Sequence, residues 1–97
     1  MGNRGIIRVL FAGAEAAPLV KVGGLGDVAG ALPAALAEEA KPGLDIRLFL
    51  PFHAEIKRKN PAVGLLGTFF VPYRTGTFPE TLFVTQSQRL KTYLLDS

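Results

Sequence analysis

A glycine-rich segment with a lysine and an aspartate has the residue types best suited to chemistry. It reads Lys21-Val22-Gly23-Gly24-Leu25-Gly26-Asp27-Val28. Glycines let a ligand approach the backbone closely, and a helical pattern of apolar residues begins at Leu25. The unpaired N–H groups and the dipole of a helix N-terminus favour an anion, and Lys21 adds a full positive charge. The segment therefore predicts a site for a phosphate or a diphosphate.

Two common nucleotide-binding patterns fit this segment poorly. The run from Gly24 to Ala29 satisfies the dinucleotide pattern G-x-G-x-x-G/A, but that pattern occupies a tight turn directly after a strand, whereas about ten residues separate Ala14 from Gly24. The next expected strand ends in Leu50-Pro51, without the acid that would hold a ribose. The P-loop pattern is absent from the sequence. A dinucleotide site is therefore disfavoured.

The elements that must position this segment follow from the apolar pattern. Residues 6–12 are a β-branched apolar run between two glycines, which predicts a buried strand that needs cover on both faces. Residues 13–24 contain a proline and a glycine pair and predict a loop. Apolar residues then recur at helical spacing and predict an amphipathic helix that ends near residue 40 and is kinked at Pro33; they are Leu25, Val28, Ala29, Leu32 and Leu36.

The second half of the chain predicts more strands. Residues 45–50 form a strand that Pro51 stops, and because a helix separates it from the first strand, the two should be parallel with a right-handed crossover. A short helical or irregular stretch follows at residues 53–59. Apolar runs at residues 65–73, 81–85 and 90–95 predict an antiparallel meander, although the breaks between them lack the Asn-Gly signature of a tight hairpin.

Composition excludes several function classes. The 97 residues, 48% hydrophobic and 20% charged, are typical of one globular α/β domain. The net charge is +3, but the basic residues are scattered, and the one dense run, Lys57-Arg58-Lys59, is interpreted as a solvated loop or helix end, so no nucleic-acid partner is expected. With no cysteine and the single His53, neither a disulfide framework nor a structural zinc site is expected.

The sequence predicts a cytoplasmic protein without a membrane partner. Its N-terminus offers no continuous apolar signal segment, because Arg8 directly follows two isoleucines. No stretch approaches the length of about 18 apolar residues that a membrane span needs. No cofactor or metal is predicted.

The sequence from Glu15 through Val28, running on into Gly30-Ala31-Leu32-Pro33, resembles the N-terminal signature of bacterial glycogen synthases and plant starch synthases. The match is long and has no gap. Residues 45–51 resemble that family's second strand, and residues 89–96 more loosely resemble the strand that closes its early β-meander. The resemblance therefore spans nearly the whole chain.

This resemblance implies the glycosyltransferase-B arrangement, in which two Rossmann-like domains face each other across a cleft. The chain would be a partial Rossmann-like N-terminal domain, a βαβ unit followed by a β-meander, with residues 1–97 forming one incomplete domain. The family transfers glucose from ADP-glucose to the non-reducing end of an α-1,4-glucan with retention. Because the second domain supplies most of the nucleotide contacts, the resemblance implies that this chain has no catalytic residue and is inactive by itself.

The resemblance also assigns site residues. Lys21, Gly23 and Gly24 would lie at the donor diphosphate, with Gly24 offering its backbone N–H. Asp27 would face the glucosyl or acceptor pocket, and Glu15 would lie toward the glucan side. For Asp27 the helix dipole alone is a sufficient explanation, and some of the glycines serve turns and close packing. His53 is interpreted as a surface or partly packed residue without a catalytic role, and Pro33 and Pro51 as structural.

Alternatives remain open at the level of the sequence. A stand-alone phosphate- or nucleotide-binding module would need only the glycine segment, and an interaction piece would bind no nucleotide. A sister glucosyltransferase that uses UDP-glucose or another sugar donor is also open, because the contacts to the donor base lie outside these residues. Since a parallel sheet needs helices on both faces, an uncovered apolar face is expected, and with it self-association or a partner.

Overall fold

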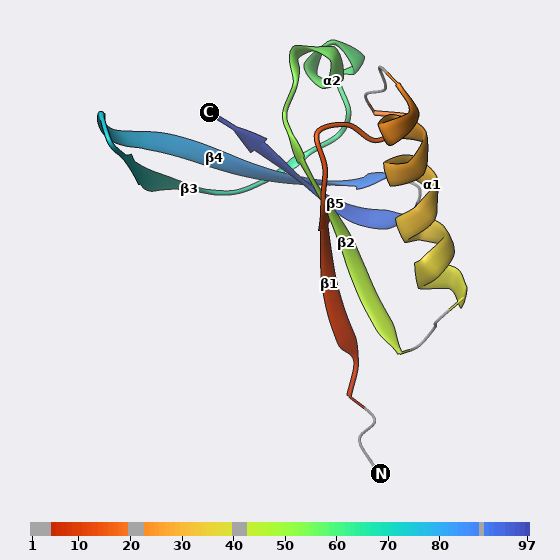
Figure 1. Cartoon of the computed structure of the whole chain (residues 1–97). Helices are drawn as coiled ribbons and strands as arrows, with labels where there is room; N and C mark the ends of the chain where they lie inside the picture. The colour runs from red at the N-terminus through yellow and green to blue at the C-terminus, as the bar shows by residue number, and fades with distance from the viewer. Residues whose placement is uncertain (1–4, 20–22, 40–42, 88) are drawn as a thin grey trace.

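One five-stranded sheet organises the part of the chain that the computed structural model describes, residues 5–19, 23–39, 43–87 and 89–97 (Figure 1). The strand order is β1-β2-β5-β4-β3. The elements in chain order are β1 (Ile7–Ala12), α1 (Gly24–Glu39), β2 (Leu44–Pro51), α2 (Ala54–Lys59), β3 (Gly64–Tyr73), β4 (Gly76–Ser87) and β5 (Leu90–Asp96).

The sheet joins a parallel half to an antiparallel half. β1 pairs with β2 in parallel, with Ile7 opposite Leu44, which confirms the predicted parallel pair on either side of a helix. β5 pairs in parallel with the other edge of β2 and antiparallel with β4, which in turn pairs antiparallel with β3. The predicted meander is therefore confirmed, and its last strand, β5, connects it to the βαβ unit in one continuous sheet.

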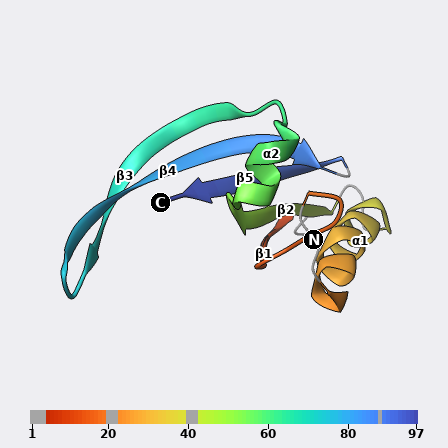
Figure 2. The same cartoon turned by 90° about the horizontal axis from the view of Figure 1, so that it is seen from above.

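The meander is built from tight hairpins. Tyr73 pairs with Gly76 across a two-residue turn, and Ser87 pairs with Leu90. Neither turn has an Asn-Gly pair, but each has a residue at positive φ within it or beside it: Gly76 has φ 145° and Arg89 has φ 64°. Because of the first hairpin, β4 begins at Gly76 and not at residue 81, and the paired strands β3 and β4 extend as a curved arm beyond the rest of the sheet (Figure 2).

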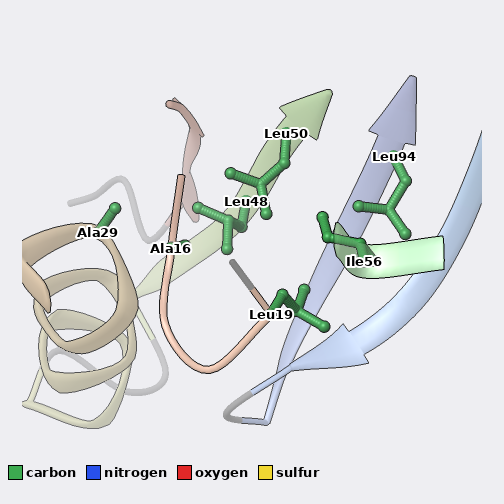
Figure 3. Close-up of a cluster of buried hydrophobic side chains, with 7 residues drawn as sticks. All are labelled: Ala16, Leu19, Ala29, Leu48, Leu50, Ile56 and Leu94. Carbon is green, nitrogen blue, oxygen red and sulfur yellow. The ribbon is translucent and has the colours of Figure 1, made fainter. Parts of the chain in front are cut away.

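The core lies on one face of the sheet (Figure 3). Side chains alternate between the faces of a strand, so Leu48 and Leu50 of β2 share a face, and Leu94 of β5 pairs beside Leu50. Ile56 of α2 and Ala29 of α1 pack against this face, so both helices cover the same side. Two residues of the loop between β1 and α1, Ala16 and Leu19, complete the cluster.

α1 packs on the sheet through small residues. Its extent agrees with the predicted helix, and Pro33 lies inside it without ending it; the predicted kink stays a prediction. The buried positions are Gly26, Ala29, Gly30 and Pro33. The larger apolar residues that identified the helix are 42–55% exposed: Leu25, Val28, Leu32 and Leu36. The helix therefore buries a narrow face of small residues and leaves the wider apolar stripe at the surface.

The prediction that the first strand is buried on both faces was wrong for the described residues. β1 is an edge strand, and its Ile7 and Leu10 side chains are 66% and 58% exposed. Among the described strands it pairs with β2 alone, and neither helix makes extensive contact with it. Further apolar side chains are exposed on the β3–β4 arm, such as Phe70 at 68%, so the predicted uncovered apolar surface is present. Self-association stays a prediction.

Neither of the two described helices has the length and apolar character needed to cross a membrane.

Candidate functional site

The loop between β1 and α1 lies at the carboxyl end of β1, where ligands of open α/β sheets commonly bind. The Gly13 N–H donates to the Phe49 carbonyl oxygen at 3.0 Å, which continues the parallel pairing past the end of β1. The loop then passes beside α1, where the Ala17 N–H donates to the Gly26 carbonyl oxygen at 2.8 Å. The loop thus contacts the glycine segment at the first turn of α1.

Glu15 holds the two sides of this loop together. Its Oε1 accepts hydrogen bonds from the backbone N–H groups of Gly23 at 3.0 Å and Gly26 at 2.7 Å. A carboxylate is well suited to this place, because the N–H groups and the dipole at a helix N-terminus favour negative charge. Glu15 is therefore directed at the amides of its own loop. Its predicted place on the glucan side of a cleft stays a prediction.

Gly23 and Gly24 have no packing reason within the described residues to be glycine. An ideal Cβ built on either residue would meet no described atom within 4 Å, and neither has the positive φ that would favour glycine. Both residues are exposed. Gly30 is the opposite case, because its Cβ would lie 2.3 Å from the Ala17 carbonyl oxygen. The open space at Gly23 and Gly24 leaves their backbone accessible from outside the chain.

Of the other two predicted site residues, the structure describes Asp27 but not Lys21. Asp27 is exposed in the first turn of α1, one turn from the Gly23 backbone, where the dipole favours its carboxylate. Lys21 lies outside the described residues. The structure therefore brings Glu15, Gly23, Gly24 and Asp27 to one helix end, and the prediction for Lys21 stays a prediction.

Sequence reasoning missed two residues that contact this loop from α2. The His53 Nε2 lies 2.7 Å from the Ala14 carbonyl oxygen, so the residue is partly packed as predicted but has a specific partner. Lys59 Nζ donates to the carbonyl oxygens of Pro18 and Leu19, at 2.6 Å each. These pairs are about 40 residues apart in the sequence, and no local pattern indicates them.

The basic run at the end of α2 is exposed as predicted, but each member has a partner. Lys57 forms an ion pair with Asp96 of β5 at 3.0 Å and lies 5.4 Å from the centre of the Phe52 ring. Arg58 pairs with Glu55 of the same helix. Lys57 and Lys59 therefore tether α2 to its surroundings, whereas Arg58 pairs within the helix.

A second polar cluster lies on the sheet face away from the helices. Arg47 donates to both carboxylate oxygens of Asp45 at 3.2 Å and to the Tyr93 hydroxyl at 2.5 Å. The hydrogen bond from Arg47 holds the pKa of Asp45 below its ordinary value, and the same bond raises the pKa of Arg47. Both charged side chains are about one-third exposed, so the cluster is interpreted as an ion pair within β2 that a hydrogen bond from Arg47 links to Tyr93 of β5.

A metal centre is not built by the residues that the structure describes. Among residues 5–19, 23–39, 43–87 and 89–97, no three histidine, aspartate or glutamate side chains lie together so as to hold a metal ion.

Comparison with known proteins extends these observations. Residues 8–97 match the model of the family described as starch synthase catalytic domain. A glycogen synthase of Dechloromonas aromatica is 42% identical over 92 residues, which cover 93% of this chain and 18% of that protein. A glycogen synthase of Gloeobacter violaceus is 48% identical over 67 residues, covering 66% of this chain and 14% of the relative.

A solved structure agrees with the fold. The catalytic domain of starch synthase IV from Arabidopsis thaliana, bound to ADP and acarbose, matches with a TM-score of 0.77 and 25% identity over 94% of this chain and 18% of that chain. This confirms the predicted α/β fold of a glycosyltransferase-B fragment. The chain thus spans less than a fifth of the length of each of these three proteins. On the family match and the identity to these relatives, the chain belongs to the starch synthase catalytic domain family.

Proposed function

We propose that residues 1–97 are the N-terminal part of the catalytic domain of a bacterial, cytoplasmic glycogen synthase and form a single, incomplete domain. The whole enzyme would transfer glucose from ADP-glucose to the non-reducing end of an α-1,4-glucan with retention, in glycogen biosynthesis. The names of the bacterial relatives support the glucan product. The ADP and acarbose bound to the similar plant domain support a nucleotide-sugar donor and a glucan acceptor.

The observation that carries this proposal is the open backbone at Gly23 and Gly24. Both glycines are exposed at the start of α1, and no described atom occupies the space that a side chain would take. Glycine is the residue that lets a ligand contact the backbone directly, and a helix N-terminus favours an anion. No described residue accepts a hydrogen bond from the Gly24 N–H. We assign this N–H and Lys21 to the diphosphate of the donor.

Glu15 shapes this site by occupying the neighbouring amides. Its carboxylate accepts from Gly23 and Gly26, so a diphosphate would meet the Gly24 N–H beside an existing negative charge. The full positive charge of Lys21 would offset that repulsion, because opposite charges attract each other. Asp27, exposed on the same helix turn, would face the glucosyl or acceptor side.

The chain by itself should not transfer glucose. Breaking the bond between glucose and the diphosphate develops negative charge on the leaving group, and preorganised positive groups lower that barrier, each by a factor of about 10² to 10³. The matched residues cover only 14% and 18% of two relatives, and the remaining sequence of such an enzyme would supply further cations and the acceptor site. A measurable rate of glucosyl transfer from ADP-glucose by the 97-residue chain would contradict this part of the proposal.

Calorimetric titration with ADP and ADP-glucose tests the diphosphate site. The variant Lys21→Ala removes the proposed cation, and Lys91→Ala, an exposed lysine on β5, is the matched control for lost charge. We expect weak, saturable binding that is lost in Lys21→Ala and kept in Lys91→Ala. Equal binding by both variants would contradict the assignment of Lys21. A folded chain that binds neither ligand would mean that these residues serve as scaffold and need the rest of the enzyme.

A further inference from the structure

The short helix α2 spans the outside of the loop that leads to the glycine segment, and each of its ends contacts the loop backbone. At its start, the His53 ring lies 2.7 Å from the Ala14 carbonyl oxygen. At its end, the Lys59 ammonium donates to the carbonyl oxygens of Pro18 and Leu19, both at 2.6 Å. Figure 1 shows α2 and this loop at the same end of the sheet. Residues 14–19 are therefore bridged by one helix.

α2 is itself held in place by contacts that do not involve these loop carbonyls. Ile56 is fully buried in the core beside Leu48, Leu50 and Leu94 (Figure 3). Lys57 forms its ion pair with Asp96 at the end of β5. α2 is thus fixed relative to the sheet, and because His53 and Lys59 bind the loop carbonyls, they hold the loop in a fixed position relative to the sheet as well.

The two sides of the loop are held by groups of opposite kind. Its carbonyl oxygens at Ala14, Pro18 and Leu19 accept from a histidine and an ammonium group, whereas the Gly23 and Gly26 amides donate to a carboxylate. Because the partner of the His53 ring is a carbonyl oxygen, its Nε2 must carry a hydrogen. Lysine offers three donors, so one ammonium can serve both carbonyls, and such charge-assisted bonds are stronger than neutral ones.

We propose that His53 and Lys59 are positioning residues for the donor site. They hold residues 14–19 so that Glu15 reaches the amides of Gly23 and Gly26 and the Gly24 backbone stays open to the diphosphate. This inference rests on the proposed function for its ligand, but the bracing of the loop can be measured without any ligand.

A purely stabilising role would give a different pattern of effects. His53 is partly exposed and Lys59 is exposed, and neither belongs to the buried cluster. Their loss should raise the local opening of the loop and leave the opening of the core strands unchanged, because local and global opening have separate free energies. The amides that report local opening are Ala17, bonded to the Gly26 carbonyl, and Gly26, bonded to Glu15.

The test compares Lys59→Met, which keeps the length of the side chain without its charge, with Lys59→Arg, which keeps donors and charge. Arg58→Met, one residue away and paired with Glu55 of the same helix, is the matched control. Amide hydrogen exchange by NMR follows Ala17 and Gly26, with Leu50 as the core reference, and calorimetry gives the affinity for ADP. We expect Lys59→Met to speed exchange at Ala17 and Gly26 by about five- to tenfold and to weaken ADP binding several-fold.

Rescue by the conservative variant separates positioning from packing. Lys59→Arg should restore both readouts, and Arg58→Met should change neither. His53→Leu should act like Lys59→Met, and His53→Gln, whose amide can donate to the Ala14 carbonyl, should restore the exchange rates; this second pair decides the question if Lys59→Met does not fold.

Two results would overturn the inference: exchange at Ala17 and Gly26 that does not change in Lys59→Met and His53→Leu, or faster exchange with unchanged ADP affinity. A folded wild-type chain that does not bind ADP would instead mean that these residues serve as scaffold and need the rest of the enzyme, and it would overturn the positioning role for a diphosphate site in this chain. In that case, unchanged loop exchange in the variants would overturn the bracing as well, and faster exchange restored by Lys59→Arg would support it.

Discussion

The close approach of α1 to the loop at Ala17 makes Gly30 the most sensitive position for a small substitution. A Cβ at Gly30 would lie 2.3 Å from the Ala17 carbonyl oxygen, 2.9 Å from its nitrogen and 3.0 Å from its carbonyl carbon. All three atoms belong to the backbone, so no side chain can rotate away. In Gly30→Ala, the helix and the loop must therefore separate by about 1 Å to reach an ordinary contact distance.

The expected loss of stability follows from three contributions. Overpacking of this kind costs about 1–3 kcal/mol. Separation also weakens the 2.8 Å hydrogen bond from the Ala17 N–H to the Gly26 carbonyl oxygen, which adds about 1 kcal/mol. Alanine is the better helix former by about 1 kcal/mol, which offsets part of this loss. We therefore expect the free energy of unfolding to fall by about 2 kcal/mol, and the melting temperature of a chain of this size by about 10 °C.

Urea and thermal unfolding followed by circular dichroism measure this effect. Gly24→Ala is the matched control, because it adds the same methyl group to the same helix where no described atom lies within 4 Å. We expect it to change stability by less than about 0.5 kcal/mol, while blocking the proposed approach of the diphosphate. If Gly30→Ala were as stable as the wild type, the packing of α1 on Ala17 described above would be refuted.

Three further predictions concern the core, the surface stripe and the ion pair. Leu50→Ala should cost about 2–5 kcal/mol in urea unfolding because Leu50 is fully buried, whereas the same substitution at Leu10, 58% exposed, should cost less than about 1 kcal/mol. Leu32→Gln should leave stability nearly unchanged, and if the exposed stripe of α1 mediates self-association, it should lower the mass measured by light scattering. Arg47 lowers the pKa of Asp45, so the ion pair stabilises the fold at pH values above the ordinary carboxylate pKa. This stabilisation is lost as the pH falls through the lowered pKa of Asp45. Asp45→Asn should therefore flatten the acid side of a curve of stability against pH, and an unchanged acid side would exclude this contribution.

Much of the fold could be predicted from local patterns. A helix between two apolar runs was enough to predict that β1 and β2 are parallel, and the runs near the C-terminus predicted the meander. The early start of β4 was missed, because residues 77–80 include a proline and a glutamate and become a strand only through pairing with β3. The burial of β1 was overestimated because an apolar run does not indicate which neighbours cover it.

The face that α1 buries could not be predicted from its apolar pattern. Leu25 and Leu32 suggested the usual wide stripe, but the helix approaches the loop so closely that only residues such as Gly30 fit. That approach depends on where the loop places Ala17, which is a tertiary property. Hydrophobic periodicity therefore located the helix correctly but did not indicate its orientation.

The sequence predicted where the candidate site lies, but not which of its residues contact one another. Glycines before a helix indicated an anion site, and Glu15 belonged to the same signature. That its carboxylate caps Gly23 and Gly26 depends on the fold of the loop. The contacts of His53 and Lys59 with the loop join residues about 40 positions apart, because the β2–α2 connection returns the chain to the end of β1. No spacing rule within a single sequence reports such a contact.

We propose that the backbone at Gly24 receives a diphosphate, and an NMR titration of the ¹⁵N-labelled chain tests this assignment most directly. ADP is added stepwise and the amide signals of Gly23, Gly24 and Gly26 are followed, with adenosine, which lacks the diphosphate, as the control ligand. We expect saturable shifts centred on Gly24 with ADP and none with adenosine. Shifts of equal size with adenosine, or ADP shifts confined to residues away from the start of α1, would contradict it.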